Sequence, residues 1–154
     1  MKRILFVCLG NICRSPAAEG VLRAKARARG IDVYIESAGT GGWHAGDPPD
    51  ARMMRAAASR GYDLSHQRAR KVSDADFFEF DYLLAMDLAN HTDLLELAPP
   101  NRECDIRLFL DFTDGEIRET PDPYYGGEQG FENALDLIEA GADAFLDYLE
   151  DESA

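Results

Sequence analysis

The chain has 154 residues, of which 45% are hydrophobic, so it can form one well-packed core but is short for two. Acidic residues outnumber Lys and Arg by 29 to 16, and the net charge of -13 argues against a nucleic acid or an anionic membrane as the main partner. No stretch approaches the ~20 apolar residues of a membrane span or forms a signal-peptide core, and the three cysteines do not suggest a disulfide framework. We therefore expect one domain, residues 1–154, in the cytoplasm with reduced thiols.

Strand-like and helix-like segments alternate along the chain. Short β-rich runs predict strands at 4–7, 33–35, 82–85 and 106–110. Capping signals and apolar periodicity predict helices at 15–29, 50–60, 73–80, 90–97 and 131–150. Ser15 and Asp50 are the expected N-caps of the first two helices, and Gly30 is the expected end of the first. The alternation predicts an α/β fold with a four-stranded parallel sheet and helices on both faces.

The segment after the first predicted strand, CLGNICR, brings a thiol, Cys8, close to a guanidinium, Arg14. Loops at the carboxyl ends of parallel strands bind ligands in α/β folds, and amides near a helix N-terminus attract anions. Gly10 allows close backbone approach, and Asn11 tolerates a left-handed conformation. The sequence therefore predicts an anion-binding loop between the first strand and the first helix.

The same loop would activate Cys8 as a nucleophile. Converging amides, the helix dipole and Arg14 all favour the thiolate form of this cysteine. Arg14 also presents a planar pair of donors that matches two oxygens of a phosphate-type anion. A thiolate beneath a bound tetrahedral anion is aimed at its central atom, which predicts phosphoryl transfer to sulfur. The Gly-Lys-Ser/Thr of nucleotide P-loops and the GxGxxG motif are both absent.

Two separate motifs place these residues in a known family. Residues 7–15, VCLGNICRS, resemble the signature of the low-molecular-weight protein tyrosine phosphatases. Residues 122–126, DPYYG, resemble the general-acid loop of the same family, and the similarity spans essentially the whole chain. The resemblance implies an enzyme that needs no metal or other cofactor, and nothing in the sequence argues against a monomer. Its substrate would be a phosphotyrosine-containing protein or a small aryl phosphate, and oxyanions such as phosphate would inhibit it.

The resemblance also implies a role for each matching residue. Cys8 corresponds to the nucleophile that forms a phosphocysteine intermediate, and Ser15 to the hydroxyl that hydrogen-bonds its thiolate. Asp122 corresponds to the general acid, which later acts as the base that activates water. Phosphate binding is implied for the loop residues Leu9, Gly10, Asn11, Ile12, Cys13 and Arg14.

Further positions match supporting parts of the family's site. Residues expected to brace the phosphate loop are Asn11, Ser37 and His66. Residues expected to line the groove for the aromatic ring are Leu9, Trp43, Tyr124 and Tyr125. Related protein arginine phosphatases carry Thr at the position of Ile12, so Ile12 favours tyrosine. Cys13 corresponds to a neighbouring cysteine that can form a reversible disulfide with the nucleophile.

Two other functions stay open at this point. An arsenate reductase of the same fold also places a cysteine beneath an oxyanion loop, but it relays electrons through further cysteines, and only Cys104 lies outside the loop here. A non-catalytic oxyanion-binding module is expected to have lost Cys8 or Asp122, and both are present. A zinc site is not expected, because no second cysteine pair follows and the three histidines lie far apart in sequence.

Overall fold

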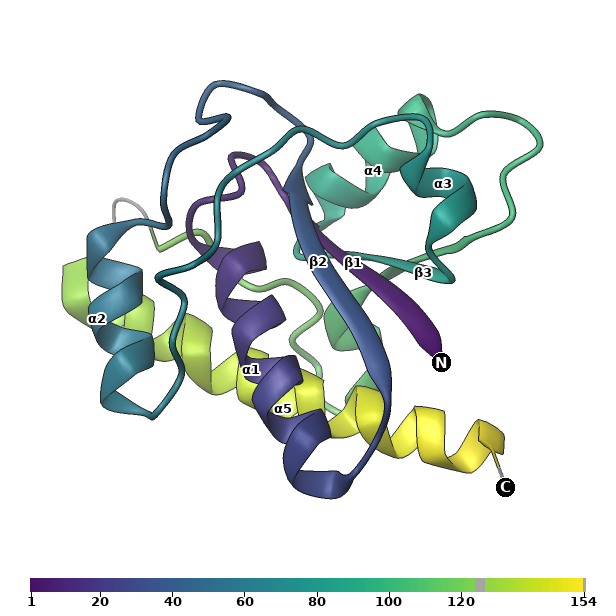
Figure 1. The fold of residues 1–154 in the computed structure, drawn as a ribbon. Helices are drawn as coiled ribbons and strands as arrows, with labels where there is room; N and C mark the ends of the chain where they lie inside the picture. Colours follow the sequence, from purple (N-terminus) through teal and green to yellow (C-terminus); the bar gives the residue numbers. More distant parts are fainter. Residues whose placement is uncertain (124–126, 154) are drawn as a thin grey trace.

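Four parallel strands form a single sheet in the computed structural model, which describes residues 1–123 and 127–153. The strand order is β2-β1-β3-β4 (Figure 1). Their bounds are Lys2–Cys8 for β1, Val33–Gly39 for β2, Tyr82–Ala85 for β3 and Asp105–Leu108 for β4. The predicted single-domain α/β fold with a four-stranded parallel sheet is therefore confirmed.

Five α-helices and one short 3-10 helix complete the described part of the chain. They are α1 (Arg14–Arg29), α2 (Ala51–Ser59), α3 (Asp76–Glu79), α4 (Leu88–Leu97), the 3-10 helix η1 (Phe109–Phe112) and α5 (Gly127–Ser153). No helix among the described residues is both long and apolar enough to cross a membrane.

The helices cover both faces of the sheet, as Figure 1 shows. Side chains alternate along β1, so Ile4 and Phe6 enter one buried cluster while Leu5 and Val7 enter the other. The first cluster includes side chains of α1, α2 and α5, and the second includes side chains of α3 and α4. Because β1 is central and covered on both sides, its carboxyl end is held firmly by the core.

Several element ends differ from the sequence-based expectation. Ser15 is not the N-cap of α1, because the helix begins at Arg14 and the Ser15 hydroxyl turns toward Cys8 instead. The predicted helix at 73–80 is reduced to the single turn of α3. The Asp76 carboxylate accepts from the Ser73 amide, as in the predicted Ser-x-x-Asp start, but residues 74 and 75 form turns and Phe80 is extended. The predicted strand at 106–110 ends at Leu108, where η1 begins.

Two helix ends have the chemistry that the sequence predicts. The Asp50 side chain accepts hydrogen bonds from the amides of Arg52 and Met53 and so caps α2. Gly30 ends α1 in the left-handed conformation, with φ of 68°. Both signals are local, which explains why they can be recognised without tertiary information.

The strand order places a binding site at the end of β1. The chain leaves β1 toward β2 on one side and later enters β3 on the other side, so the direction of the sheet reverses at β1. In open α/β sheets ligands bind at this reversal, outside the carboxyl ends of the strands. The last residue of β1 is Cys8.

Gly141 of α5 tests how tightly this helix packs. A Cβ at this position would lie 2.7 Å from a ring carbon of Phe109, which is fully buried and cannot move away. Gly141→Ala gains about 1 kcal/mol of helix propensity but overpacks the core at a cost of about 1–3 kcal/mol. We expect urea denaturation to show a net loss of stability. Ala140→Gly is the control, because Ala140 is exposed and this change measures the effect of helix propensity on stability without a packing effect. A Gly141→Ala variant more stable than the wild type would contradict the tight packing.

Candidate active site

The loop between β1 and α1 differs in how its carbonyl groups and its amides are used, as far as the described residues show. The carbonyl oxygens of Cys8, Leu9 and Ile12 accept hydrogen bonds of 2.7 to 2.9 Å from amides of residues 40–50. Asn11 turns the loop with a left-handed φ of 59°, as the sequence predicts. In the described part of the chain, none of the amides of residues 9–13 donates a hydrogen bond to another residue. A row of such amides at a helix N-terminus is suited to an anion.

Cys8 lies in this loop and is connected to a chain of polar side chains. Its Sγ is 3.0 Å from the Ser15 hydroxyl, which itself accepts a 2.8 Å hydrogen bond from the Asn11 amide group. Asn11 also donates to Ser37 at 2.9 Å and accepts from the backbone amide of Arg70 at 3.0 Å. Because Ser15 accepts from Asn11, its own hydrogen can be donated to the sulfur at 3.0 Å, with the Ala38 carbonyl at 3.5 Å as the longer alternative. The arrangement can stabilise a thiolate at Cys8.

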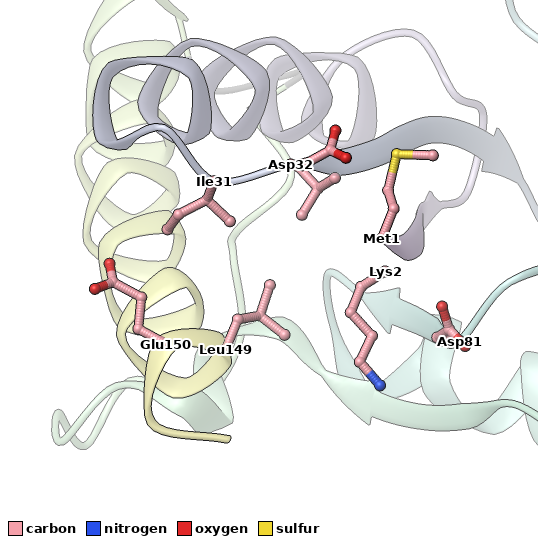
Figure 2. Close-up of a pocket in the computed structure, with 8 residues that line it drawn as sticks. Met1, Lys2, Ile31, Asp32, Asp81, Leu149 and Glu150 are labelled. Carbon is pink, nitrogen blue, oxygen red and sulfur yellow. The ribbon is translucent and has the colours of Figure 1, made fainter. Parts of the chain in front are cut away.

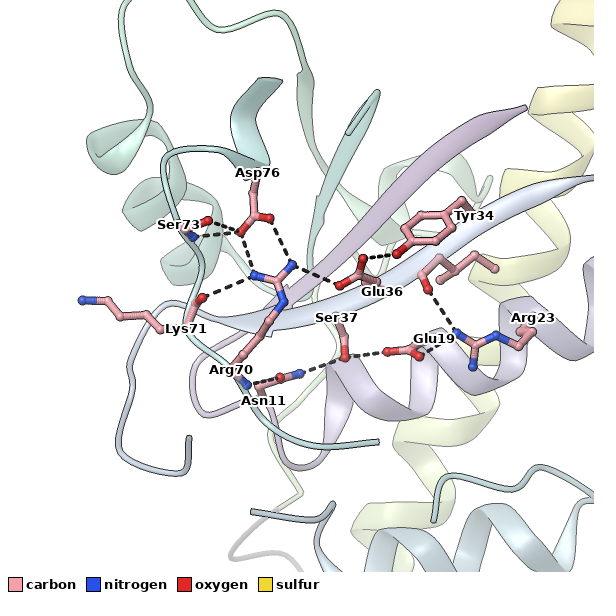
Figure 3. A network of polar contacts seen from close by, with 11 residues as sticks. Asn11, Glu19, Arg23, Tyr34, Glu36, Ser37, Arg70, Lys71, Ser73 and Asp76 are labelled. Atoms are coloured by element: carbon pink, nitrogen blue, oxygen red, sulfur yellow. Dashed lines mark hydrogen bonds and ion pairs between the residues drawn. The ribbon is translucent and has the colours of Figure 1, made fainter. Parts of the chain in front are cut away.

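The network continues away from the loop through residues that the sequence analysis did not select. Ser37 donates to the Glu19 carboxylate at 2.8 Å, and Arg23 donates to the other oxygen of Glu19 at 2.7 Å (Figure 3). His66 is exposed, and its Nε2 lies 3.4 Å from Arg23. His66 is therefore at the outer end of the network, and Glu19 occupies the position next to Ser37. No short motif marks Glu19 in the sequence.

Arg14 is a buried charge held between carboxylates. Only 3% of its surface is exposed, and it donates to Asp87 at 2.6 Å and to the carbonyl of Thr120 at 3.0 Å. A second guanidinium nitrogen lies 3.8 Å from the Asp122 carboxylate. Burial lowers the pKa of Arg14, but the charges of Cys8 and Asp87 outweigh it, so that the pKa is raised overall. The guanidinium is therefore permanently charged beside Cys8.

A cavity of about 250 Å³ opens above the loop. It is lined by Cys8, Leu9, Gly10, Ile12, Cys13, Arg14, Trp43, His44 and Asp122. The structure thus brings the two sequence motifs to one cavity, although they lie far apart in the chain. His44 is an addition that the sequence analysis did not select; a Cβ on Gly10 would lie 3.1 Å from its ring, so this glycine gives His44 room. Tyr124 and Tyr125 lie outside the described residues.

Cys13 lines the same cavity as Cys8, and both thiols are free. Burial raises the pKa of the Cys13 thiol well above its usual range, and the nearby charges of Asp50, Cys8 and Asp122 raise it further. Cys13 therefore stays protonated near neutral pH and is not a second nucleophile in the resting protein. Its role as a redox partner of Cys8 stays a prediction.

A larger cavity, of about 690 Å³, lies at the opposite edge of the sheet (Figure 2). Its lining includes Met1 and Lys2 at the start of β1, together with Asp32 and Glu150. No cysteine, serine, threonine or histidine lines it. Size alone would select this cavity, but neither a cysteine nor an arginine lines it, so it lacks the pair of thiol and guanidinium found at the loop.

Comparisons with known proteins identify the family of the chain. A family model described as low molecular weight phosphotyrosine protein phosphatase matches residues 3–154. A putative low molecular weight protein-tyrosine-phosphatase of Synechocystis is 46% identical over 142 residues, which are 89% of each chain. The crystal structure of a protein tyrosine phosphatase from Entamoeba histolytica, with Hepes in its active site, is 39% identical, covers 100% of both chains and has a TM-score of 0.94. A Drosophila arginine phosphatase structure is also similar, with 35% identity, coverage of 97% of this chain and 98% of that one, and a TM-score of 0.91.

Gly39, the last residue of β2, tests the rigidity of the loop. A Cβ there would lie 2.8 Å from the Leu9 carbonyl oxygen and 2.9 Å from that of Gly41. Because these atoms belong to the backbone, Gly39→Ala has to displace the loop. When positioned groups in an enzyme are displaced by about 1 Å, the reaction rate falls on the order of 10²-fold. We expect calorimetry to show more than about a tenfold loss of affinity for inorganic phosphate.

Gly42→Ala is the matched control for this variant. A Cβ at Gly42 would meet only the Lys71 side chain, at 3.6 Å, which is ordinary contact. We expect its phosphate affinity to equal that of the wild type. Equal affinity in Gly39→Ala, with thermal unfolding unchanged, would mean that the loop tolerates displacement and is not a rigid cradle.

Proposed function

The chain belongs to the low molecular weight phosphotyrosine protein phosphatase family, and on this basis we propose that its residues hydrolyse phosphotyrosine through a phosphocysteine intermediate on Cys8. One observation supports this mechanism above all others. Cys8 and the buried Arg14 line one cavity together with loop residues whose amides donate to no other residue in the described part of the chain, namely Leu9, Gly10, Ile12 and Cys13. Such a site binds the oxygens of a phosphate and leaves a sulfur below its phosphorus.

In the first step the substrate phosphate binds in the loop and the Cys8 thiolate attacks phosphorus. A phosphorus–sulfur bond forms as the bond to the tyrosine oxygen breaks. The loop amides and Arg14 stabilise the charge on the three equatorial oxygens in the transition state. Asp122, in its protonated form, gives its proton to the departing tyrosine oxygen. Asp122 lines the same cavity as Cys8, which is compatible with this role.

In the second step water cleaves the phosphocysteine. Asp122, now a carboxylate, accepts a proton from the water, whose oxygen attacks phosphorus. The phosphorus–sulfur bond breaks and Cys8 leaves as a thiolate, with inorganic phosphate as the product. The Ser15 hydroxyl, 3.0 Å from Sγ, stabilises the thiolate as it departs.

The walls of the cavity favour an aromatic substrate. Leu9 and Trp43 supply apolar surface, and Ile12 supplies an aliphatic side chain where arginine phosphatases are expected to carry Thr. An arsenate reductase mechanism is disfavoured by the position of Cys104. This cysteine belongs to the buried cluster on the face of the sheet opposite that of Cys8. No cysteine relay can therefore run directly between the two.

Two variants test the mechanism on p-nitrophenyl phosphate and on a phosphotyrosine peptide, without added metal. We expect no turnover in Cys8→Ser, because a hydroxyl does not replace the thiolate. We expect kcat on the peptide to fall about 10²–10⁴-fold in Asp122→Ala, the usual contribution of a general acid, with peptide binding retained. Asp114→Asn changes an exposed carboxylate nearby in sequence and should match the wild type.

A phosphoarginine peptide in the same assay tests substrate class. We expect it to be hydrolysed much more slowly than the phosphotyrosine peptide. Faster hydrolysis of phosphoarginine would overturn the tyrosine assignment while leaving the covalent mechanism intact. Persistent turnover in Cys8→Ser would instead overturn the mechanism.

A further inference from the structure

A second groove shares a wall with the catalytic cavity. It measures about 260 Å³ and lies between the loop that follows β2 and the end of α4. Leu9 and Trp43 line both the cavity and this groove. Successive residues of an extended peptide are about 3.3 Å apart. A peptide whose phosphotyrosine enters the cavity therefore brings its neighbouring residues to the groove.

The groove exposes an unusual amount of apolar side chain. Trp43 is 73% exposed, and Leu9 and Leu97 are 44% and 43% exposed. Single exposed apolar residues are common on protein surfaces, but a group of them beside a reaction site indicates a contact surface. Three such side chains around one hollow suit the aliphatic part of a long side chain.

Two carboxylates give the same groove a negative charge. Asp93 and Glu96 are three residues apart on α4 and so lie on one face of the helix. Within residues 1–123 and 127–153, neither side chain makes an ion pair or a hydrogen bond. Glu96 lies in the last turn of α4, where the helix dipole is negative and no basic residue compensates it. A cation bound here would neutralise both sources of negative potential.

We propose that this groove is a specificity subsite that accepts a cationic side chain, preferably arginine, next to the phosphotyrosine of a protein substrate. The aliphatic stem would pack on Trp43 and Leu97, and the guanidinium would bind Asp93 and Glu96. The indole of Trp43 adds a cation–π contact with the guanidinium, which a neutral side chain cannot make. An acidic side chain beside the phosphotyrosine would be repelled by the same carboxylates. This inference rests on the proposed phosphotyrosine phosphatase function.

The test uses alanine-based phosphotyrosine peptides with a single Arg, Glu or Ala placed in turn at each flanking position. For the wild type we expect kcat/KM to favour the best Arg peptide over its Glu counterpart by about tenfold at low salt, chiefly through KM. The preference should decrease as salt is added. In the double variant Asp93→Asn/Glu96→Gln the ratio should fall to near one. Turnover of p-nitrophenyl phosphate, which has no flanking residues, should be unchanged.

Asp32→Asn/Asp151→Asn is the matched control, because it removes the same two charges at exposed positions that do not line the groove. We expect it to keep the full preference for Arg. An equal Arg-to-Glu ratio in the wild type and in Asp93→Asn/Glu96→Gln would overturn the subsite. An equal fall in both double variants would show a general effect of net charge and would also overturn it. Failure of the proposed function would look different, since the wild type would then hydrolyse no peptide at all.

Discussion

The structure depends on one constraint, which is the way in which the loop after β1 satisfies its backbone. The carbonyls of Cys8, Leu9 and Ile12 accept hydrogen bonds from the segment that follows β2, and within the described residues the amides of residues 9–13 donate to no other residue. A backbone in this state has a strong preference for an anion, because amides without acceptors cost free energy. Cys8 is the last residue of the central strand, which is covered on both faces, so its sulfur lies at the start of the loop that favours the anion.

This local preference coexists with a strongly acidic chain. The net charge is -13, yet the cavity holds a buried guanidinium, Arg14, whose pKa is raised despite burial. Asp87 and the carbonyl of Thr120 accept hydrogen bonds from that guanidinium and so hold it in one orientation. The acidic surroundings then act on what accompanies the phosphate. Acidic side chains of a peptide are repelled by these charges and basic side chains are attracted. The proposed subsite at Asp93 and Glu96 rests on this difference.

The sequence predicts much of this arrangement because its strongest signals are local. The β-rich runs of the strands, the caps at Gly30 and Asp50 and the left-handed Asn11 each follow from a few adjacent residues. The two motifs at Cys8 and Asp122 are likewise short and specific.

The missed residues act through tertiary contacts. Glu19 lies within α1, Asp87 follows β3, and His44 lies in a glycine-rich loop; nothing near each one in the sequence connects it to Cys8. His66 lies at the outer end of the network and reaches the loop only through other side chains, so its bracing role stays a prediction. The Ser-Pro pair predicts Ser15 as an N-cap, but no local signal shows that its hydroxyl hydrogen-bonds the Cys8 thiol instead.

The most direct test of the central claim is to trap phosphorus on sulfur. An Asp122→Asn variant turning over p-nitrophenyl phosphate should accumulate the intermediate, since p-nitrophenolate leaves without a general acid whereas cleavage of the phosphocysteine lacks its base. Rapid acid quenching followed by peptide mass spectrometry should then find a phosphoryl group on the peptide that contains Cys8. Continued release of p-nitrophenolate over many turnovers, with no phosphoryl group on Cys8 at any quench time, would contradict the account.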